Sequence, residues 1–210
     1  MALIAVLDYG IGNLRSAQKA LERVGADARL TADPALIADA AGVVLPGVGN
    51  FGRCIQALED SGLDGIAIEA ACSGRPFLGV CVGMQMLYEG SEEVPEVPGL
   101  GVLPGTVRLI PGDVKRPQMQ WNVLDRRRDS GLLQGLPEPA WVYFVHSYAA
   151  EATAEGDETV VATCDYGTPL VAAVERGPLW ATQFHPEKSS RVGLGILANF
   201  VARAAQVQAA

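Results

Sequence analysis

The chain has 210 residues, of which 49% are hydrophobic and 19% charged, and its net charge is −8. This length and composition exclude an intrinsically disordered chain and predict one domain over residues 1–210 with a substantial core. Because binding to a phosphate backbone relies on clustered cations, the negative charge predicts no nucleic-acid partner.

The first half of the chain alternates short apolar runs with helix-sized segments. Short strands are predicted at LIAVLDYG (3–10), ARL (28–30), GVVLPG (42–47) and RPFLGV (75–80). Helices are predicted at NLRSAQKALERVGA (13–26), PALIADAA (34–41), RCIQALEDSGLDGIAIEAACSG (53–74), with a break near Ser61 and Gly62, and MQMLYEG (84–90). Alternation of this kind is typical of βαβ units and a parallel sheet.

The second half, from about residue 91, has a different character. Proline and glycine are frequent in SEEVPEVPGLGVLPG (91–105). Antiparallel strands are then predicted at TVRLI (106–110), MQWNVL (119–124), WVYFVHSY (141–148), TVVATC (159–164) and LVAAVE (170–175). A strand and turn follow at WATQFHPEKSS (180–190) and a last helix at RVGLGILANFVARAAQV (191–207). We therefore expect an α/β fold, with a mostly parallel or mixed central sheet flanked by helices and additional antiparallel strands.

The four cysteines, at positions 54, 72, 81 and 164, form no CxxC pair and have no histidine at metal-ligand spacing. We therefore expect reduced thiols, no metal site and no cofactor. No apolar run approaches the roughly 20 residues that cross a bilayer, and the first residues lack the basic segment of a signal peptide. These features predict a cytoplasmic protein with no membrane partner.

The stretch GVCVGMQ (79–85) places Cys81 between Gly79 and Gly83, directly after a predicted strand. Glycines at these positions permit a sharp strand-to-helix turn that exposes the central residue. A cysteine at the start of the next helix would also gain from the helix dipole, which favours the reactive thiolate. This stretch alone leaves a second interpretation open, in which Cys81 is a small buried residue. The other three cysteines lack flanking glycines and are expected to be structural.

A nucleophilic cysteine needs a base, and the two histidines of the chain are His146 and His185. His185 follows the apolar run LWATQF (179–184), and Glu187 comes two residues later. A carboxylate so placed can accept a hydrogen bond from one ring nitrogen while the other nitrogen faces the thiol. Because active sites of α/β sheets collect at the carboxyl ends of strands, we expect His185 to meet Cys81 there. The alternative is a histidine in an ordinary surface turn.

The segment LPGVGNFG (45–52) is a third strand end, and it is rich in glycine. Glycines let backbone amides approach a ligand and point at it. If this loop lies beside Cys81, the amides near Val48 and Gly49 could stabilise an oxyanion, which contributes about 3–4 kcal/mol per donor in other enzymes. The alternative is an ordinary strand-to-helix loop.

LPGVGNFG, FLGVCVGMQ and QFHPEKS, in this order, resemble the motifs of class I glutamine amidotransferases, and the resemblance covers nearly the whole chain. DYGIGNLRS (8–16), KRPQMQWN (115–122) and YFVHSY (143–148) narrow it to the glutaminase subunits of imidazole glycerol phosphate synthase in histidine biosynthesis. The resemblance implies a flavodoxin-like fold. It also implies an enzyme whose thiolate attacks the side-chain amide of glutamine, releases ammonia and forms a glutamyl thioester that water hydrolyses.

By this resemblance Cys81, His185 and Glu187 match the catalytic triad. The oxyanion donors are matched by Gly47, Val48, Gly49 and Val82, the glutamine-binding positions by Gln85, His146, Ser147 and Tyr148, and the partner interface by Asn13, Arg15, Met119, Trp121, Asn122 and Tyr143. For His146 and for the interface residues, a role in the fold alone is the alternative. The partner implied is a (β/α)₈ cyclase subunit, which forms a heterodimer with the glutaminase and uses its ammonia to make imidazole glycerol phosphate and AICAR.

Two features depart from this pattern or add to it. Many relatives have glycine where this chain has Gln120, which puts the geometry of the interface in doubt at that point. The cationic groups Lys115, Arg116 and Arg126 to Arg128 invite a phosphate-binding interpretation, but charge clusters are usually solvated faces, and we expect one here.

The sequence leaves three other hypotheses open. Another amidotransferase of the same class would serve anthranilate, pyridoxal phosphate or guanine synthesis, against which Met84 and the segment YFVHSY argue. A cysteine peptidase on a related fold would cleave peptides without a partner. A non-catalytic module would keep the fold without its chemistry, an interpretation that the presence of all three triad residues disfavours.

Overall fold

The computed structural model describes residues 1–150 and 158–208, so the predicted domain over 1–210 extends beyond the described ranges. Its main sheet has eight strands in the order β2-β1-β3-β4-β13-β12-β11-β8. The parallel part consists of β1 (Leu3–Leu7), β2 (Asp27–Thr31), β3 (Gly42–Gly47), β4 (Phe77–Cys81) and β13 (Leu179–Thr182). The antiparallel part consists of β12 (Pro169–Arg176), β11 (Val160–Asp165) and β8 (Asp125–Arg126). The predicted mixed sheet is confirmed.

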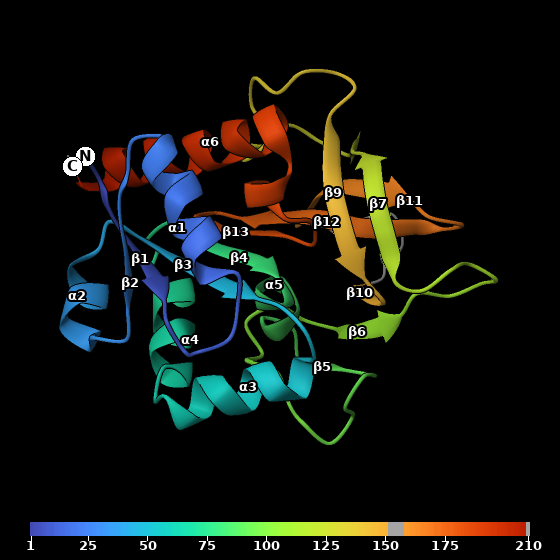
Figure 1. Cartoon of the computed structure of the whole chain (residues 1–210), viewed down its shortest axis with the longest axis horizontal. Coiled ribbons are helices and arrows are strands. Elements are labelled where there is room, and N and C mark those ends of the chain that lie inside the picture. Colours follow the sequence, from blue (N-terminus) through green and yellow to red (C-terminus); the bar gives the residue numbers. More distant parts are fainter. Residues whose placement is uncertain (151–157, 209–210) are drawn as a thin grey trace.

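Helices cover both faces of this sheet (Figure 1). Helices α1 (Leu14–Arg23) and α6 (Ser190–Gln208) lie on one face, and α3 (Phe51–Asp60) and α4 (Asp64–Cys72) lie on the other. Every residue of β3, β4 and β13 is buried, which is why these strands are almost entirely apolar. The remaining helices are α2 (Pro34–Asp39), α5 (Val82–Met86) and the short 3₁₀ helix η1 (Pro186–Lys188).

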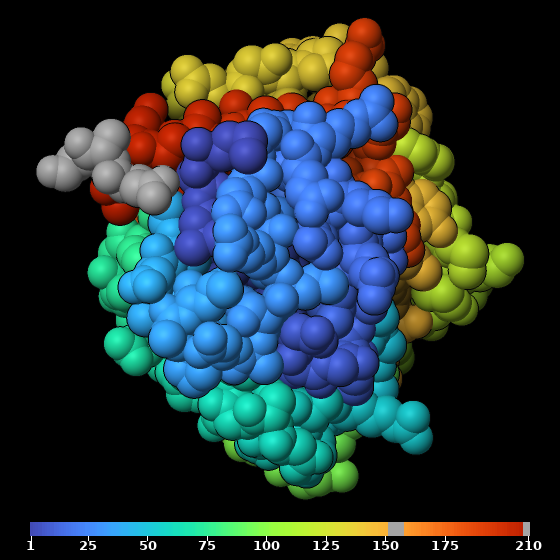
Figure 2. Space-filling model, turned by 60° about the vertical axis from the view of Figure 1, so that its left-hand side comes forward, coloured from blue at the N-terminus to red at the C-terminus, as the bar shows by residue number. Residues whose placement is uncertain are grey.

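Two smaller sheets flank the main one. Strands β7 (Gln118–Val123) and β9 (Trp141–His146) form an antiparallel pair that stands across β11 and β12 at the right of Figure 1. The second small sheet contains β5 (Gly90–Ser91), β6 (Thr106–Leu109) and β10 (Tyr148–Ala150). In Figure 2 the first half of the chain, blue to green, fills the near side, while the added strands lie along its right-hand edge. The antiparallel strands of the second half therefore both extend and flank the central sheet, as predicted.

Two predicted boundaries are corrected by the structure. The helix predicted at 84–90 begins at Val82 and ends at Met86, and Gly90 already starts β5. The segment predicted as one strand over 141–148 divides at Ser147 into β9 and β10, which belong to different sheets. The break predicted near Ser61 is confirmed, since α3 ends at Asp60 and α4 begins at Asp64.

Within the two described ranges, none of the helices has both the length and the apolar character required to span a membrane.

Candidate active site

Cys81 lies at the tip of a sharp turn between β4 and α5. It is the last residue of β4, and its backbone has φ +56° and ψ −113°, a region that residues with a side chain rarely occupy. In residues 1–150 and 158–208, Ser190 is the one other non-glycine residue with positive φ. The structure thus places Cys81 on the kind of strained turn that exposes a nucleophile in other α/β enzymes.

Glycines allow the turn to press against the end of β3. A Cβ atom added to Gly83 would run into the carbonyl oxygen of Leu45, and one added to Gly47 would lie 2.5 Å from the backbone nitrogen of Gly83. The obstructing atoms are backbone, so no side-chain rotation could relieve either overlap. The glycines of both motifs are therefore needed for one close approach between β3 and the Cys81 turn.

Three strand ends lie side by side at this point. β3, β4 and β13 are neighbours in the sheet, and Gly47, Cys81 and, three residues beyond β13, His185 lie at or beyond their carboxyl ends. This is the edge at which open α/β sheets place their ligands.

His185 and Glu187 form a buried pair. The ring Nδ1 of His185 lies 2.8 Å from Oε1 of Glu187, and the two side chains are 2% and 4% exposed. Glu187 stands in η1, directly after Pro186, and its Oε1 also accepts a hydrogen bond from Nδ2 of Asn13 at 3.2 Å. Glu187 therefore fixes the orientation of the imidazole ring.

The charge of this pair follows from its contacts. Burial alone would lower the pKa of His185, but hydrogen bonds and charge interactions with Cys81 and Glu187 outweigh it and raise the pKa to about 9. Burial alone would raise the pKa of Glu187, but the hydrogen bonds from His185 and Asn13 lower it. At neutral pH the site therefore favours an imidazolium next to the sulfur, an arrangement that stabilises a thiolate.

Hydrogen bonds from neighbouring residues fix the loop between β3 and α3 (residues 48–50). Tyr9 Oη donates to the carbonyl of Pro46 at 2.6 Å, and the thiol of Cys54 donates to the carbonyl of Val48 at 3.3 Å. Asn50 caps α3 by accepting from the backbone nitrogen of Arg53. These contacts fix two carbonyls of the strand end and loop next to Cys81.

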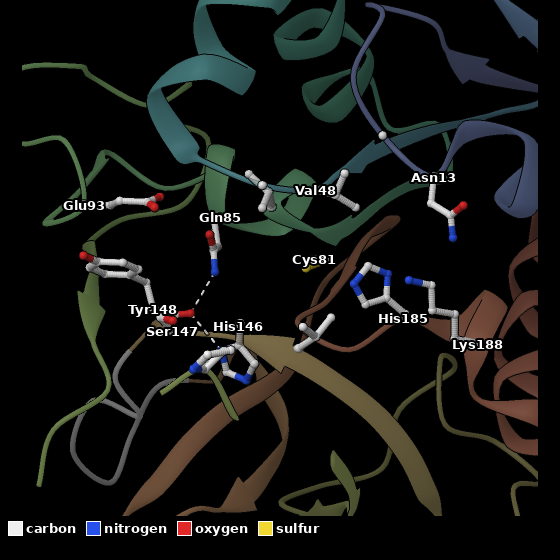
Figure 3. A pocket seen from close by; sticks show the side chains of 15 residues that line it. Asn13, Val48, Cys81, Gln85, Glu93, His146, Ser147, Tyr148, His185 and Lys188 are labelled. Carbon is white, nitrogen blue, oxygen red and sulfur yellow. Dashed lines mark hydrogen bonds between the residues drawn. The ribbon is translucent and has the colours of Figure 1, made fainter. Parts of the chain in front are cut away.

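An open cavity of about 520 Å³ joins these parts, which is the size of a site for a small molecule. Figure 3 shows Val48, Cys81 and Gln85 on one side of it and His146, Tyr148 and His185 on the other. Of the residues predicted to contact substrate or oxyanion, the lining includes Cys81, His185, Val48, Gly49, Val82, Gln85, His146, Ser147 and Tyr148. Gly47 and Glu187 lie behind this lining.

The carbonyl of Tyr148 organises the far wall of the cavity. It lies 2.8 Å from Nδ1 of His146 and accepts a hydrogen bond from Nε2 of Gln85, also at 2.8 Å (Figure 3). Burial lowers the pKa of His146 to about 4, so its ring is neutral at pH 7 and its Nδ1–H donates to this carbonyl. Its Nε2 is buried and has no hydrogen-bond partner in the described part of the chain.

His146 should make the protein less stable in acid. Because its pKa of about 4 lies below the ordinary 6.5, the unfolded chain binds a proton that the folded chain does not between these values. Stability is therefore lost as the pH falls from 6.5 to 4, by about 3 kcal/mol. Urea unfolding at both pH values should show this extra loss in the wild type but not in His146→Gln, whose amide can still donate to Tyr148. Equal acid sensitivity of the two proteins would contradict the assignment.

The other cysteines lack this environment. Burial raises the pKa of Cys54 and raises that of Cys164 to about 12, so both remain protonated thiols at neutral pH. Cys72 is exposed on α4.

The residues predicted at the partner interface lie in three parts of the structure: on strands β7 and β9, at the cavity, and on α1. Met119 and Trp121 are 61% and 45% exposed on β7, and Trp121 packs edge-on against Tyr143 of β9 with ring centroids 6.1 Å apart. Asn13 lines the cavity and Arg15 is exposed on the first turn of α1. Asn122 is half-buried, and its side chain donates a hydrogen bond to the carbonyl of Asp165 at 2.8 Å. Gln120 is exposed between Met119 and Trp121.

The cationic groups make local contacts. Arg116 donates to the carbonyls of Ile110 and Gly112. Arg126 donates to the carbonyl of Leu136, and its Nε lies 3.3 Å from the carboxylate of Glu138. Contacts of this kind fit the solvated face expected for these residues.

Several residues at the site were missed by the sequence analysis. Gln183, which is fully buried, donates to the sulfur of Cys81, and Lys188 and Glu93 line the cavity. Glu93 also accepts a hydrogen bond from the backbone nitrogen of Phe51 at the start of α3. The spacing of two residues between Gln183 and His185 is a signal that could have suggested a shared face. Glu93 lies in the proline-rich segment, where no periodic pattern marks it.

Comparison with known proteins gives a consistent result. Residues 5–204 match the family model of class-I glutamine amidotransferases. The chain is 48% identical over 200 residues to imidazole glycerol phosphate synthase subunit HisH of Symbiobacterium thermophilum, covering 95% of this chain and 93% of that protein. It is 49% identical over 199 residues to the HisH subunit of Deinococcus radiodurans, covering 94% and 92%.

Solved structures show the same fold at lower identity. A crystal structure of a glutamine amidotransferase has a TM-score of 0.74 and 23% identity, over 96% of this chain and 98% of that one. PurLQS of Thermotoga maritima has a TM-score of 0.70 and 18% identity, over 98% and 99%. By the family match and by its relatives, the chain belongs to the class-I glutamine amidotransferases and, within them, to the HisH subunits of imidazole glycerol phosphate synthase.

Proposed function

We propose that this chain hydrolyses glutamine to glutamate and ammonia through Cys81, His185 and Glu187. The observation that carries the proposal is the buried His185–Glu187 pair, 2.8 Å apart, next to a cysteine on a strained turn at the wall of one cavity. A cysteine with an oriented histidine is the arrangement that activates a thiol for nucleophilic attack.

The reaction has two steps. In the first, the Cys81 thiolate attacks the side-chain amide carbon of glutamine, and the imidazolium of His185 gives its proton to the leaving ammonia, which forms a glutamyl thioester. In the second, neutral His185 takes a proton from water, the hydroxide attacks the thioester, and the Cys81 thiolate leaves as glutamate forms. Glu187 accepts the Nδ1–H of His185 throughout and so keeps Nε2 directed to the reacting atoms.

The backbone supplies the oxyanion donors in this proposal. The amides around Gly47, Val48 and Gly49, together with that of Val82 after the nucleophile, stabilise the negative oxygen that develops when sulfur attacks the amide. Val48, Gly49 and Val82 line the same cavity as Cys81, which supports this role. Gln85 and the segment His146, Ser147 and Tyr148 hold the glutamine on the far wall.

The ammonia serves a second subunit. We propose a heterodimer with a (β/α)₈ cyclase subunit that uses the ammonia to make imidazole glycerol phosphate and AICAR for histidine biosynthesis, with no cofactor on this chain. The relatives are named as subunits of that synthase, and the exposed Met119 and Trp121 on β7 offer an apolar surface for a partner.

Hydrogen bonds connect Tyr143, at the proposed interface, to His185, the proposed base. The backbone nitrogen of His185 donates to the carbonyl of Tyr143 at 3.1 Å, and Ser189 Oγ donates to the carbonyl of His185 while it accepts from the nitrogen of Tyr143. A partner that packs on Trp121 and Tyr143 therefore touches the strand that holds His185, which supports activation of the glutaminase by the partner.

The proposal predicts that the chain co-purifies with the (β/α)₈ partner, and that its glutaminase rate rises when the partner and the partner's nucleotide substrate are present. Trp121→Ala should weaken the pair by more than about tenfold, since buried tryptophans dominate interface energies. Ile68→Ala, which trims an exposed apolar residue on α4, is the matched control and should leave binding unchanged. Failure to bind the partner, or high glutaminase activity without it, would contradict this part of the proposal.

A further inference from the structure

Gln183 is a buried amide in direct contact with the proposed nucleophile. It follows the last residue of β13 directly, two positions before His185, and it is fully buried. Its Nε2 donates to the sulfur of Cys81 at 3.9 Å, and its Oε1 accepts from Nε2 of Gln85 at 3.0 Å. An N–H donor on sulfur stabilises the charged thiolate more than the neutral thiol.

The direction of this amide is fixed by its neighbours. The carbonyl of Tyr148 can only accept, so the side-chain nitrogen of Gln85 must face it. The same nitrogen then reaches the amide of Gln183, which has to present its oxygen there and its nitrogen to Cys81. Rotating the Gln183 amide by half a turn would oppose two nitrogen donors and direct an oxygen at the sulfur. One backbone carbonyl thus orients a chain of two amides that ends at the nucleophile.

We propose that Gln183 is a further catalytic residue of this chain, whose side-chain N–H stabilises the Cys81 thiolate both in the resting site and when the thioester breaks. This inference rests on the proposed use of Cys81 as the nucleophile.

The two-step reaction explains why a second donor is needed. When the thioester is hydrolysed, His185 is taking a proton from water, and it cannot also donate to the departing sulfur until that transfer is complete. Gln183 is uncharged, keeps its N–H at every stage, and does not compete for the proton. His185 therefore moves the proton, while Gln183 holds the charge on sulfur.

A second buried pair shows that such a contact alone does not activate a thiol. Gln118 donates to the sulfur of Cys164, also at 3.9 Å, and both side chains are fully buried. Burial nevertheless raises the pKa of Cys164 to about 12. Gln183 is expected to act because His185 stands at the same sulfur, and the Gln118–Cys164 pair provides a matched control.

The test is the alkylation of Cys81 by iodoacetamide in the full chain, followed by mass spectrometry of the Cys81 peptide across the neutral to alkaline range. Gln183→Met keeps the length of the side chain but removes the donor, and it should slow alkylation about tenfold at neutral pH and less at alkaline pH. Gln183→Asn keeps the amide but is too short to reach the sulfur, so it should slow alkylation of Cys81 as Gln183→Met does. Gln118→Met should leave the Cys81 profile unchanged.

Turnover supplies a second readout. In the assembled pair, Gln183→Met should lower kcat for glutamine about tenfold while KM changes little, because Gln85 loses its bond to Gln183 but keeps its hydrogen bond to the carbonyl of Tyr148. Circular dichroism and thermal unfolding identify variants that fail to fold. If one of the two Gln183 variants does not fold, the other still tests the inference. Folded Gln183 variants that alkylate as fast as the wild type at every pH would overturn the inference. A wild-type pair that does not hydrolyse glutamine would instead overturn the proposed function, so the two failures are distinguishable.

Discussion

The Cys81→Ala protein is expected to lose glutamine-dependent synthesis by at least about 10⁴-fold when paired with the (β/α)₈ subunit, while synthesis from added ammonium is retained. The alanine removes the sulfur that forms the thioester in the proposed reaction, whereas the fold loses little because Ala is smaller than Cys and fits the turn. Free ammonia bypasses this chain, so the partner keeps its own activity. Product formation with glutamine alone and with ammonium alone gives the two rates.

Cys72→Ala is the control for this experiment. Cys72 is exposed on α4 and touches none of the proposed site, so both rates should equal those of the wild type. Glutamine-dependent synthesis that survives in Cys81→Ala would show that the nucleophile lies elsewhere. Loss of ammonium-dependent synthesis would show that the substitution had damaged the pair and not only the thiol.

Gly83→Ala is expected to destabilise the chain by about 3 kcal/mol or more and to lower glutaminase activity by at least about 100-fold. The new Cβ would overlap the carbonyl oxygen of Leu45, a backbone atom of the buried strand β3. Relief requires β3 and the Cys81 turn to separate, which moves the nucleophile away from the proposed oxyanion amides. Urea unfolding and the glutaminase assay of the assembled pair measure the two effects.

Gly65→Ala provides the matched comparison. Gly65 is also helical, in α4, and a Cβ at this position would meet nothing within 4 Å. The substitution should be neutral or stabilise the fold by up to about 1 kcal/mol, since alanine favours the helix. If Gly83→Ala were as stable and as active as Gly65→Ala, the close approach of β3 to the turn would not be essential.

The order of helices and strands could be predicted because the first half carries strong local patterns. Its strands β3 and β4 are buried on both faces and read as continuous apolar runs, and glycines mark the turns at Gly25 and near Ser61. The strands of the second half are harder to predict from the sequence, because tertiary contacts determine where they begin, end and pair. The run over 141–148 has a uniform pattern, yet it divides at Ser147 because its two parts pair with β7 and β6.

The candidate site was predictable where a motif is local and unpredictable where it depends on long-range packing. Cys81, with its flanking glycines, and His185, with Glu187, are each found within a few residues of sequence. The bonds of Gln183 to Gln85 and Cys81 join residues 98 and 102 positions apart, so no local pattern could show them. In the same way, the hydrogen bond from Asn122 to the carbonyl of Asp165 joins residues that are 43 positions apart, so no local pattern could show it.

The most direct test of the account is to look for the glutamyl thioester on Cys81. The assembled pair is mixed with glutamine and the partner's nucleotide substrate, quenched in acid at successive times, and digested for mass spectrometry. We predict that the peptide carrying Cys81 bears a glutamyl group during turnover and that the peptides of Cys54 and Cys164 do not. Turnover of glutamine with the Cys81 peptide unmodified at every time would contradict covalent catalysis by this residue.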